Sequence, residues 1–185
     1  ATTDISKAFL QGVTYKELSE LTGEPLREVN FYLPAYNIPM LRAVPGFENF
    51  DPSVEVLHCD KPGTGSVDAP RAFSMKLKKV LLEEGRMTQC SVDNELCVKH
   101  SNGRLIGLIT IHVDDVKITG EQIFIKTIMA LLERHFGQLK ILWNNFTNCG
   151  VLHDQDKQTK QITLDQTSYA KTLQCIDHVE LKCNK

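Results

Sequence analysis

The sequence predicts an α+β fold built on a largely antiparallel sheet. Strand-like runs occur in pairs joined by tight turns, and amphipathic helical segments alternate with these pairs along the chain. The 185 residues, 42% hydrophobic and 24% charged with a formal charge of -2, are typical of a globular chain with a sizeable core. The net charge does not by itself indicate a nucleic-acid binder, but local basic patches could still exist because net charge hides local sign. We expect the six cysteines to be free thiols in a reducing compartment.

The first helix is predicted between Thr14 and Gly23. Glu17 follows Thr14 by three residues, which is the spacing of a capping box. Leu18 and Leu21 would then face inward from this short helix.

Short strands are expected at residues 28–34 and 53–59, on either side of a loop rich in Pro and Gly. A glycine-bearing loop then leads into a second helix, because Pro70 suits the first turn of a helix and Gly85 suits its end. Between them runs an apolar stripe of helical period, made of Ala69, Phe73, Leu77, Val80 and Leu81.

The middle of the chain predicts two consecutive tight turns. Asn102-Gly103 is a strong hairpin signal and would pair residues 96–100 with residues 105–111. The next turn, after the run ending at Ile111, carries Asp114 and Asp115. The hairpin therefore ends in two adjacent carboxylates.

A long helix is predicted from Gln122 to Phe136, stopped by Gly137. Its apolar face consists of Phe124, Ile128, Leu131 and Leu132. Residues 148–153 and 161–166 are expected to form another hairpin, followed by a helix that begins near Gln166 and is capped by Asp165.

The carboxylates indicate a candidate metal site. Like charges at about 4 Å repel by roughly 4 kcal/mol at an effective dielectric near 20, so Asp114 and Asp115 would gain from a bound cation. Asp4 could join them if residues 1–4 form a strand beside this hairpin. Oxygen ligands of this kind suit Mg²⁺. The alternative is an ordinary exposed turn, where Asp is common.

Four motifs occur in the order typical of one family. They are DISKAFLQG at residues 4–12, GSVDAPRAFSMKL at 65–77, HVDD at 112–115 and QITLDQTSYAKTL at 161–173. Together they resemble the reverse transcriptase domain of copia-type long-terminal-repeat retrotransposons, over nearly the whole chain. The resemblance implies a polymerase right-hand palm, with a largely antiparallel sheet flanked by helices, partial fingers and the start of the thumb.

The resemblance also implies roles for the aspartates and for one aromatic residue. Asp4 and Asp114 match the metal-binding carboxylates, and Asp115 matches the second aspartate of the catalytic box, which supports the site. Two Mg²⁺ ions, replaceable by Mn²⁺, would be bound there. Phe9 matches the aromatic gate that packs under the incoming sugar and rejects a 2′-hydroxyl.

Further roles follow from the same resemblance. Thr64 and Gly65 match the loop beside the nucleotide sugar and the templating pair. Cys149 and Gly150 lie where the family grips the primer. His112 departs from the pattern because it stands where the family has Tyr.

The function implied is RNA-directed DNA polymerisation, with an RNA or DNA template-primer and dNTPs as partners and no membrane. RNase H and integrase segments would accompany it in the parent polyprotein, inside a cytoplasmic particle or in the nucleus. Residues 1–153 would form the palm with partial fingers, and residues 154–185 the primer-grip hairpin and the start of the thumb. We expect the chain to be a piece of a longer polypeptide and inactive alone. A decayed, non-catalytic remnant with weak nucleic-acid binding is the alternative.

Each of two further groups of side chains has two possible interpretations. Trp143 and Phe146 could stack a base or pack at a sheet edge. A basic helix face could be solvated or could bind nucleic acid; it consists of Arg71, Lys76, Lys78 and Lys79.

Overall fold

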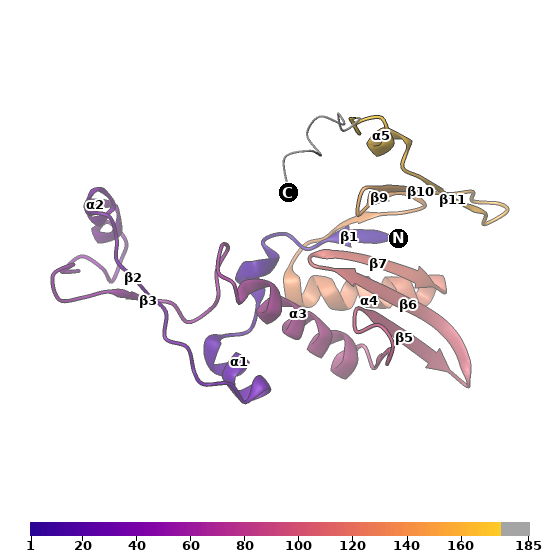
Figure 1. The fold of residues 1–185 in the computed structure, drawn as a ribbon. Helices are drawn as coiled ribbons and strands as arrows, with labels where there is room; N and C mark the ends of the chain where they lie inside the picture. The colour runs from indigo at the N-terminus through magenta and orange to yellow at the C-terminus, as the bar shows by residue number, and fades with distance from the viewer. Residues whose placement is uncertain (175–185) are drawn as a thin grey trace, which may run out of the picture. The chain divides into compact units, whose positions relative to one another are not determined.

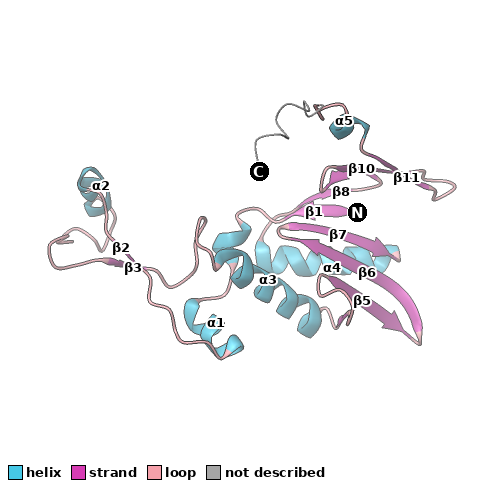
Figure 2. Cartoon of the chain, viewed as in Figure 1, coloured by secondary structure: helices cyan, strands magenta, loops and turns pink. Residues whose placement is uncertain are grey.

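The computed structural model describes residues 1–174 and divides the chain into two compact units (Figure 1). The first unit combines Ala1–Ser6 with the chain from Arg86 onward, and the second is Lys7–Gly85. Helices and antiparallel strands occur together, so the predicted α+β class is confirmed (Figure 2).

The first unit is built on a six-stranded sheet with the order β4-β5-β6-β7-β1-β8. Every pairing in it is antiparallel. The N-terminal strand lies between β7 and β8, which places the start of the chain inside the sheet, one strand from the β8 edge. The strands are β1 (Thr2–Asp4), β4 (Thr88–Gln89), β5 (Leu96–Ser101), β6 (Arg104–His112), β7 (Asp115–Gly120) and β8 (Lys140–Leu142).

Helix α4 (Gln122–Phe136) covers one face of this sheet, and both its predicted ends are confirmed. Alternate residues of β6 and β7 point to that face and are buried: Ile109, Ile111, Val116 and Ile118. At the far end of the two strands, Gly107 lies directly opposite Gly120, and both approach the ring of Phe124 on α4. The absence of side chains there lets the helix sit close to the sheet.

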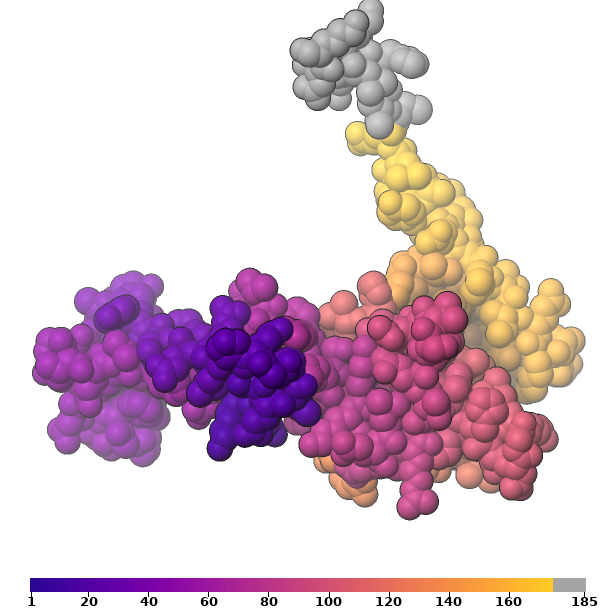
Figure 3. All heavy atoms as spheres, turned by 60° about the horizontal axis from the view of Figure 1, so that its bottom comes forward, coloured from indigo at the N-terminus to yellow at the C-terminus, as the bar shows by residue number. Residues whose placement is uncertain are grey.

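A three-stranded sheet with the order β11-β10-β9 follows in the same unit. It consists of β9 (Asn145–Asn148), β10 (Val151–Gln155) and β11 (Ile162–Asp165), and is drawn in orange to yellow in Figure 3. The predicted pairing of residues 148–153 with 161–166 is confirmed as β10 with β11, whereas β9 was not predicted. The predicted functional boundary after residue 153 falls inside β10.

Helix α5 (Thr167–Ala170) begins where a helix was predicted, and the Asp165 carboxylate accepts a hydrogen bond from the Thr167 backbone N–H at 2.7 Å. Residues 175–185, which include Cys175, Cys183 and the end of the expected thumb segment, lie outside the described residues. None of the helices in residues 1–174 is long and apolar enough to span a bilayer.

The second unit begins with the short turn η1 (Ala8–Gln11) and helix α1 (Tyr15–Thr22). The predicted capping box is confirmed, because the Thr14 side chain accepts from the Glu17 N–H and the Glu17 carboxylate accepts from the Thr14 N–H. The prediction that Leu21 faces inward is wrong: it is 51% exposed. The small core beside α1 is completed by Leu18, together with Val13, Ala72 and Met75.

Residues 23–68 of this unit form a long segment with little regular structure. It is followed by helix α3 (Ala69–Lys79), which continues as the π-helical turn η3 (Val80–Glu84). All the predicted apolar positions of α3 and η3 are buried. The two predicted strands pair but are short, and the loop between them contains helical turns that were not predicted. These elements are β2 (Asn30–Phe31), η2 (Ala35–Asn37), α2 (Ile38–Arg42) and β3 (Leu57–His58).

Candidate functional site

The pairing of β1 with β7 places Asp4 directly opposite Asp115. Residues directly opposite in an antiparallel pair point to the same face, with their Cβ atoms about 4.5–5.5 Å apart. The strand expected at residues 1–4 therefore exists and brings two of the three predicted carboxylates together at one end of the sheet.

Asp114 lies in the turn that joins β6 to β7, between the paired residues His112 and Asp115. The Ile5 backbone N–H donates to the Asp114 carbonyl at 3.3 Å, which ties this turn to the end of β1. Its other central residue, Val113, has a φ of 58°. A β-branched residue in the left-handed region is strained, and such strain is found preferentially at functional sites.

The electrostatics of Asp4 reflect this crowding. Loss of hydration at the sheet end raises the pKa of the Asp4 carboxyl above its ordinary value, and the charges of Asp114 and then Asp115 raise it further. Lys140 of β8, directly opposite Asp4 on its other side, opposes this rise. A row of three charged residues thus crosses three strands: Asp115, Asp4 and Lys140. Its two carboxylates outnumber its one ammonium group, as a cation site requires.

Lys140 provides a test of this row. Lys140→Gln should raise the pKa of Asp4 further, because the opposing charge of Lys140 is lost. A carboxyl whose pKa is raised by folding favours the native state below its unfolded pKa, and this contribution is lost as pH rises through the folded value. Because the variant raises the folded pKa of Asp4, this loss of stability should continue to a higher pH than in the wild type.

The measurement is the carboxyl ¹³C shift of Asp4, followed as a function of pH. Lys126→Gln on α4 removes the same charge from an exposed position and serves as the matched control. An Asp4 titration that Lys140→Gln leaves unchanged would contradict the assigned electrostatic row.

The turn between β9 and β10 also lies near these carboxylates. Cys149 and Gly150 have φ values of 49° and 75°, the two positive values of a type I′ hairpin turn. Cys149 is exposed, but some loss of hydration raises the pKa of its thiol, and the charge of Asp115 raises it further. The predicted primer-grip pair is therefore within electrostatic reach of the candidate metal site.

A buried aromatic pair lies on the two strands that this turn joins. Phe146 and His153 are directly opposite on β9 and β10, and their rings stack with centroids 5.2 Å apart. Burial lowers the pKa of His153, and Lys117 lowers it further, which favours the neutral imidazole. Phe146 consequently packs within the sheet, the second of the two roles considered for it.

The remaining predicted residues belong to the second unit. Phe9 is half-buried in η1, whereas Thr64 and Gly65 are exposed in the loop before α3. Gly65 has a φ of 90°, a conformation that favours glycine. The next residue of η1, Leu10, adjoins this loop, since a Cβ added to Gly63 would lie 3.9 Å from Leu10 Cδ2. The structure thus brings η1 and the loop together within this unit.

The carboxylates fit Mg²⁺ by their chemistry. Mg²⁺ is usually bound by one or two carboxylates, with water and substrate phosphates as the other ligands. Across residues 1–174, no three Asp, Glu, His or Cys side chains converge into a preformed metal cage. Any ion held by Asp4 and Asp114 would therefore take its other ligands from water or from a bound substrate.

Lys140 and His153 were not identified from the sequence. Lys140 enters the site through the pairing of a three-residue strand with β1, more than a hundred residues away in the chain. His153 was missed because its stacking partner, Phe146, lies on β9, the strand that was not predicted.

No family model, curated protein or solved structure matches this chain. The four motifs and the geometry of the carboxylate row are therefore the features of the chain that bear on its function.

Proposed function

We propose that this chain is the palm of an RNA-directed DNA polymerase of the copia-type reverse transcriptases that its motifs resemble. The observation that carries the proposal is the juxtaposition of Asp4 on β1 with Asp115 on β7, beside Asp114 in a strained turn. The sequence separates Asp4 from the other two by more than a hundred residues, yet both motifs lie at the same end of the sheet.

Within this proposal, Asp4 and Asp114 bind two Mg²⁺ ions, for which Mn²⁺ can substitute, and Asp115 supports them. Such ions, when bound, activate the primer 3′-hydroxyl and stabilise the leaving pyrophosphate. Lys140 offsets part of the negative charge of Asp4 before a cation arrives. Val113, with its positive φ, lies in the same turn as Asp114.

Other residues would position the substrates. Phe9 would pack under the sugar of the incoming dNTP, with Thr64 and Gly65 beside it. The Cys149-Gly150 turn would contact the primer end, which agrees with its electrostatic coupling to Asp115. Contacts to the template would be mainly to phosphate and sugar, because a polymerase must accept every sequence.

The parent polyprotein would supply RNase H and integrase activities, and the enzyme would act in a cytoplasmic particle or in the nucleus. The experiment that tests the proposal is primer extension on an RNA template with dNTPs and Mg²⁺, by residues 1–185 within the longer polypeptide that the resemblance implies. We expect extension by the wild type and a loss of at least a hundredfold in Asp4→Asn.

Absence of extension with either Mg²⁺ or Mn²⁺ would overturn the proposal, as would extension that survives Asp4→Asn. Binding of template-primer without any extension would instead identify a non-catalytic remnant.

A further inference from the structure

A cleft of about 660 Å³ opens at the end of β7 away from the carboxylates. It lies within the first unit, between the end of β7, the first turn of α4, the linker from β8 to β9 and the β10–β11 hairpin. Its β7 residues are Ile118–Gly120, three to five residues beyond Asp115. At about 3.3 Å per residue, this is roughly 10–17 Å along the strand. The cleft is therefore a separate site.

One wall of the cleft carries an aromatic ring next to an anchored segment of backbone. Trp143 is 42% exposed and follows β8 directly. The next residue, Asn144, adopts a φ of 63°, and its carbonyl accepts a hydrogen bond from the Gln155 N–H at 2.9 Å. Ile118 and Ile125 are buried and line the cleft beside the indole. A flat ring could stack on this indole against an apolar surface.

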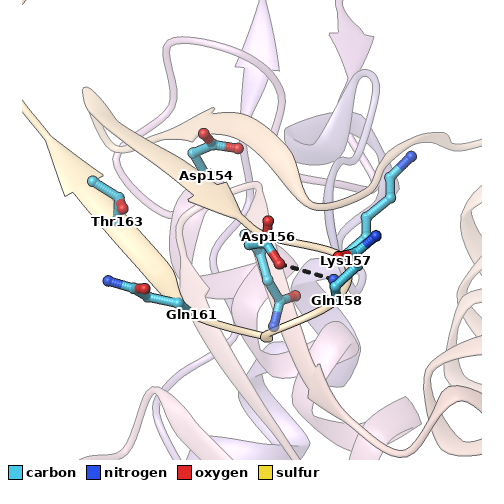
Figure 4. A pocket seen from close by; sticks show the side chains of 7 residues that line it. Asp154, Asp156, Lys157, Gln158, Gln161 and Thr163 are labelled. Carbon is cyan, nitrogen blue, oxygen red and sulfur yellow. Dashed lines mark hydrogen bonds between the residues drawn. The ribbon is translucent and has the colours of Figure 1, made fainter.

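The rim of the cleft is positively charged. Lys157 and Lys160 come from the β10–β11 hairpin, and none of the described residues that line the cleft is acidic. Asp156 precedes Lys157 in the same turn. Its carboxylate is already engaged, because it accepts from the Gln158 N–H at 2.9 Å and from the Thr159 N–H at 2.6 Å. Figure 4 shows Asp156 turned toward Gln158, while Lys157 extends away from the turn.

The same hairpin offers a useful contrast. A second hollow, shown in Figure 4, shares Lys157 with the Trp143 cleft but is also lined by Asp154 and Asp156, so its carboxylates outnumber its lysine. The Trp143 cleft instead combines lysines with the amides of Gln122 and Asn144. Side-chain amides can both donate to and accept from the edge of a heterocyclic base. An anion that carries only an apolar group would leave these amides without hydrogen-bond partners.

We infer that the Trp143 cleft binds a nucleoside phosphate, with the base stacked on Trp143 and the phosphate between Lys157 and Lys160. Lysine ammonium groups bind phosphate as compact point charges. The Lys160 ammonium donates to the Lys157 carbonyl at 2.6 Å and keeps two further N–H groups for the phosphate. The inference does not depend on the proposed polymerase activity, because the carboxylates take no part in it.

Trp143 is the single tryptophan of the chain and reports directly on the cleft. Titration of the 185-residue chain with adenosine 5′-monophosphate should quench its fluorescence to saturation. Adenosine lacks the phosphate and inorganic phosphate lacks the ring, so each should bind at least tenfold more weakly. Absence of saturable quenching by the nucleotide, or equal quenching by adenosine, would overturn the assignment.

A double variant, Lys157→Gln with Lys160→Gln, should weaken nucleotide binding about tenfold, which corresponds to about 1.4 kcal/mol. Both side chains are exposed, so the fold should tolerate their loss. The matched control is Lys16→Gln with Lys61→Gln, which removes the same charge from exposed positions in the second unit. Equal affinity in the two double variants would contradict the lysine rim.

The phosphate could belong to a free nucleotide or to a nucleic-acid strand. A six-residue oligodeoxyadenylate, titrated beside the mononucleotide, separates these sources. Tighter binding of the oligomer, with a steep dependence on salt, would assign the cleft to a strand. Equal affinity per nucleotide would assign it to a free nucleotide. Asp114→Asn should leave either result unchanged, which keeps this test distinct from that of the carboxylate site.

Discussion

Asp114→Asn should weaken divalent-metal binding at the end of the sheet without destabilising the fold. In the wild type, Mn²⁺ should broaden amide resonances near Asp4 and near Asp114 at the same concentrations, because the two residues would share the ions. We expect the variant to bind Mn²⁺ at least tenfold more weakly, a loss of about 1.4 kcal/mol. Asn is compatible with the turn, and the hydrogen bond from Ile5 goes to the backbone carbonyl of residue 114, which the variant keeps.

The melting temperature should stay level or rise, because one of three like charges is removed. Asp60→Asn is the matched control, since it removes an 86% exposed carboxylate from the second unit. Broadening that persists in Asp114→Asn would exclude a shared site. Broadening near residue 114 with none near residue 4 would show that the β1–β7 pairing does not create a metal site shared by Asp4 and Asp114.

The structure shows which features the local sequence could predict. Helix α4 has the predicted ends because a continuous apolar stripe runs up to Gly137. The capping box at Thr14 and the hairpin at Asn102-Gly103 also depend on neighbouring residues alone. These elements were predictable because their determinants lie within one or two turns of the chain.

Features that depend on distant pairing were harder to predict. β9 carries no alternation of apolar and polar residues, and it is a strand because β10 pairs with it. β8 is three residues long and joins the sheet through β1. Leu21 has the right spacing for a buried face, but the small core beside α1 ends at Leu18. In each case the tertiary partner, absent from the local pattern, decides the outcome.

The candidate site divides in the same way. Asp4, Asp114 and Asp115 were identified by motif and by the expected strand, and the structure supplies the register that places Asp4 opposite Asp115. Lys140 was missed because nothing near it in sequence marks it as a neighbour of Asp4. Trp143 and Phe146 were considered together, yet Phe146 is buried against His153 while Trp143 lines an open cleft.

Gly107→Ala should be strongly destabilising. Gly107 on β6 lies opposite Gly120 on β7, and a Cβ at residue 107 would overlap the ring of Phe124. Overpacking of a core costs about 1–3 kcal/mol, and expulsion of a buried Phe ring would add roughly 1.5–3 kcal/mol. We expect a loss near 3 kcal/mol, and a melting temperature lower by about 6–12 °C at roughly 2–4 °C per kcal/mol.

Gly63→Ala is the matched control, because the nearest heavy atom to its added Cβ would be 3.9 Å away, an ordinary contact. A double-mutant cycle then locates the cause. Phe124→Leu shortens the obstructing side chain, so Gly107→Ala should cost less in that background, with a coupling of about 1–2 kcal/mol. Equal costs in both backgrounds would show that α4 does not press on β6 at this point. The cycle tests the fold separately from the chemistry, because Gly107 and Phe124 lie at the end of the hairpin away from Asp114. If α4 holds this hairpin to the sheet as described, folded Gly107→Ala molecules should still bind Mn²⁺ with wild-type affinity, and only the folded fraction should fall.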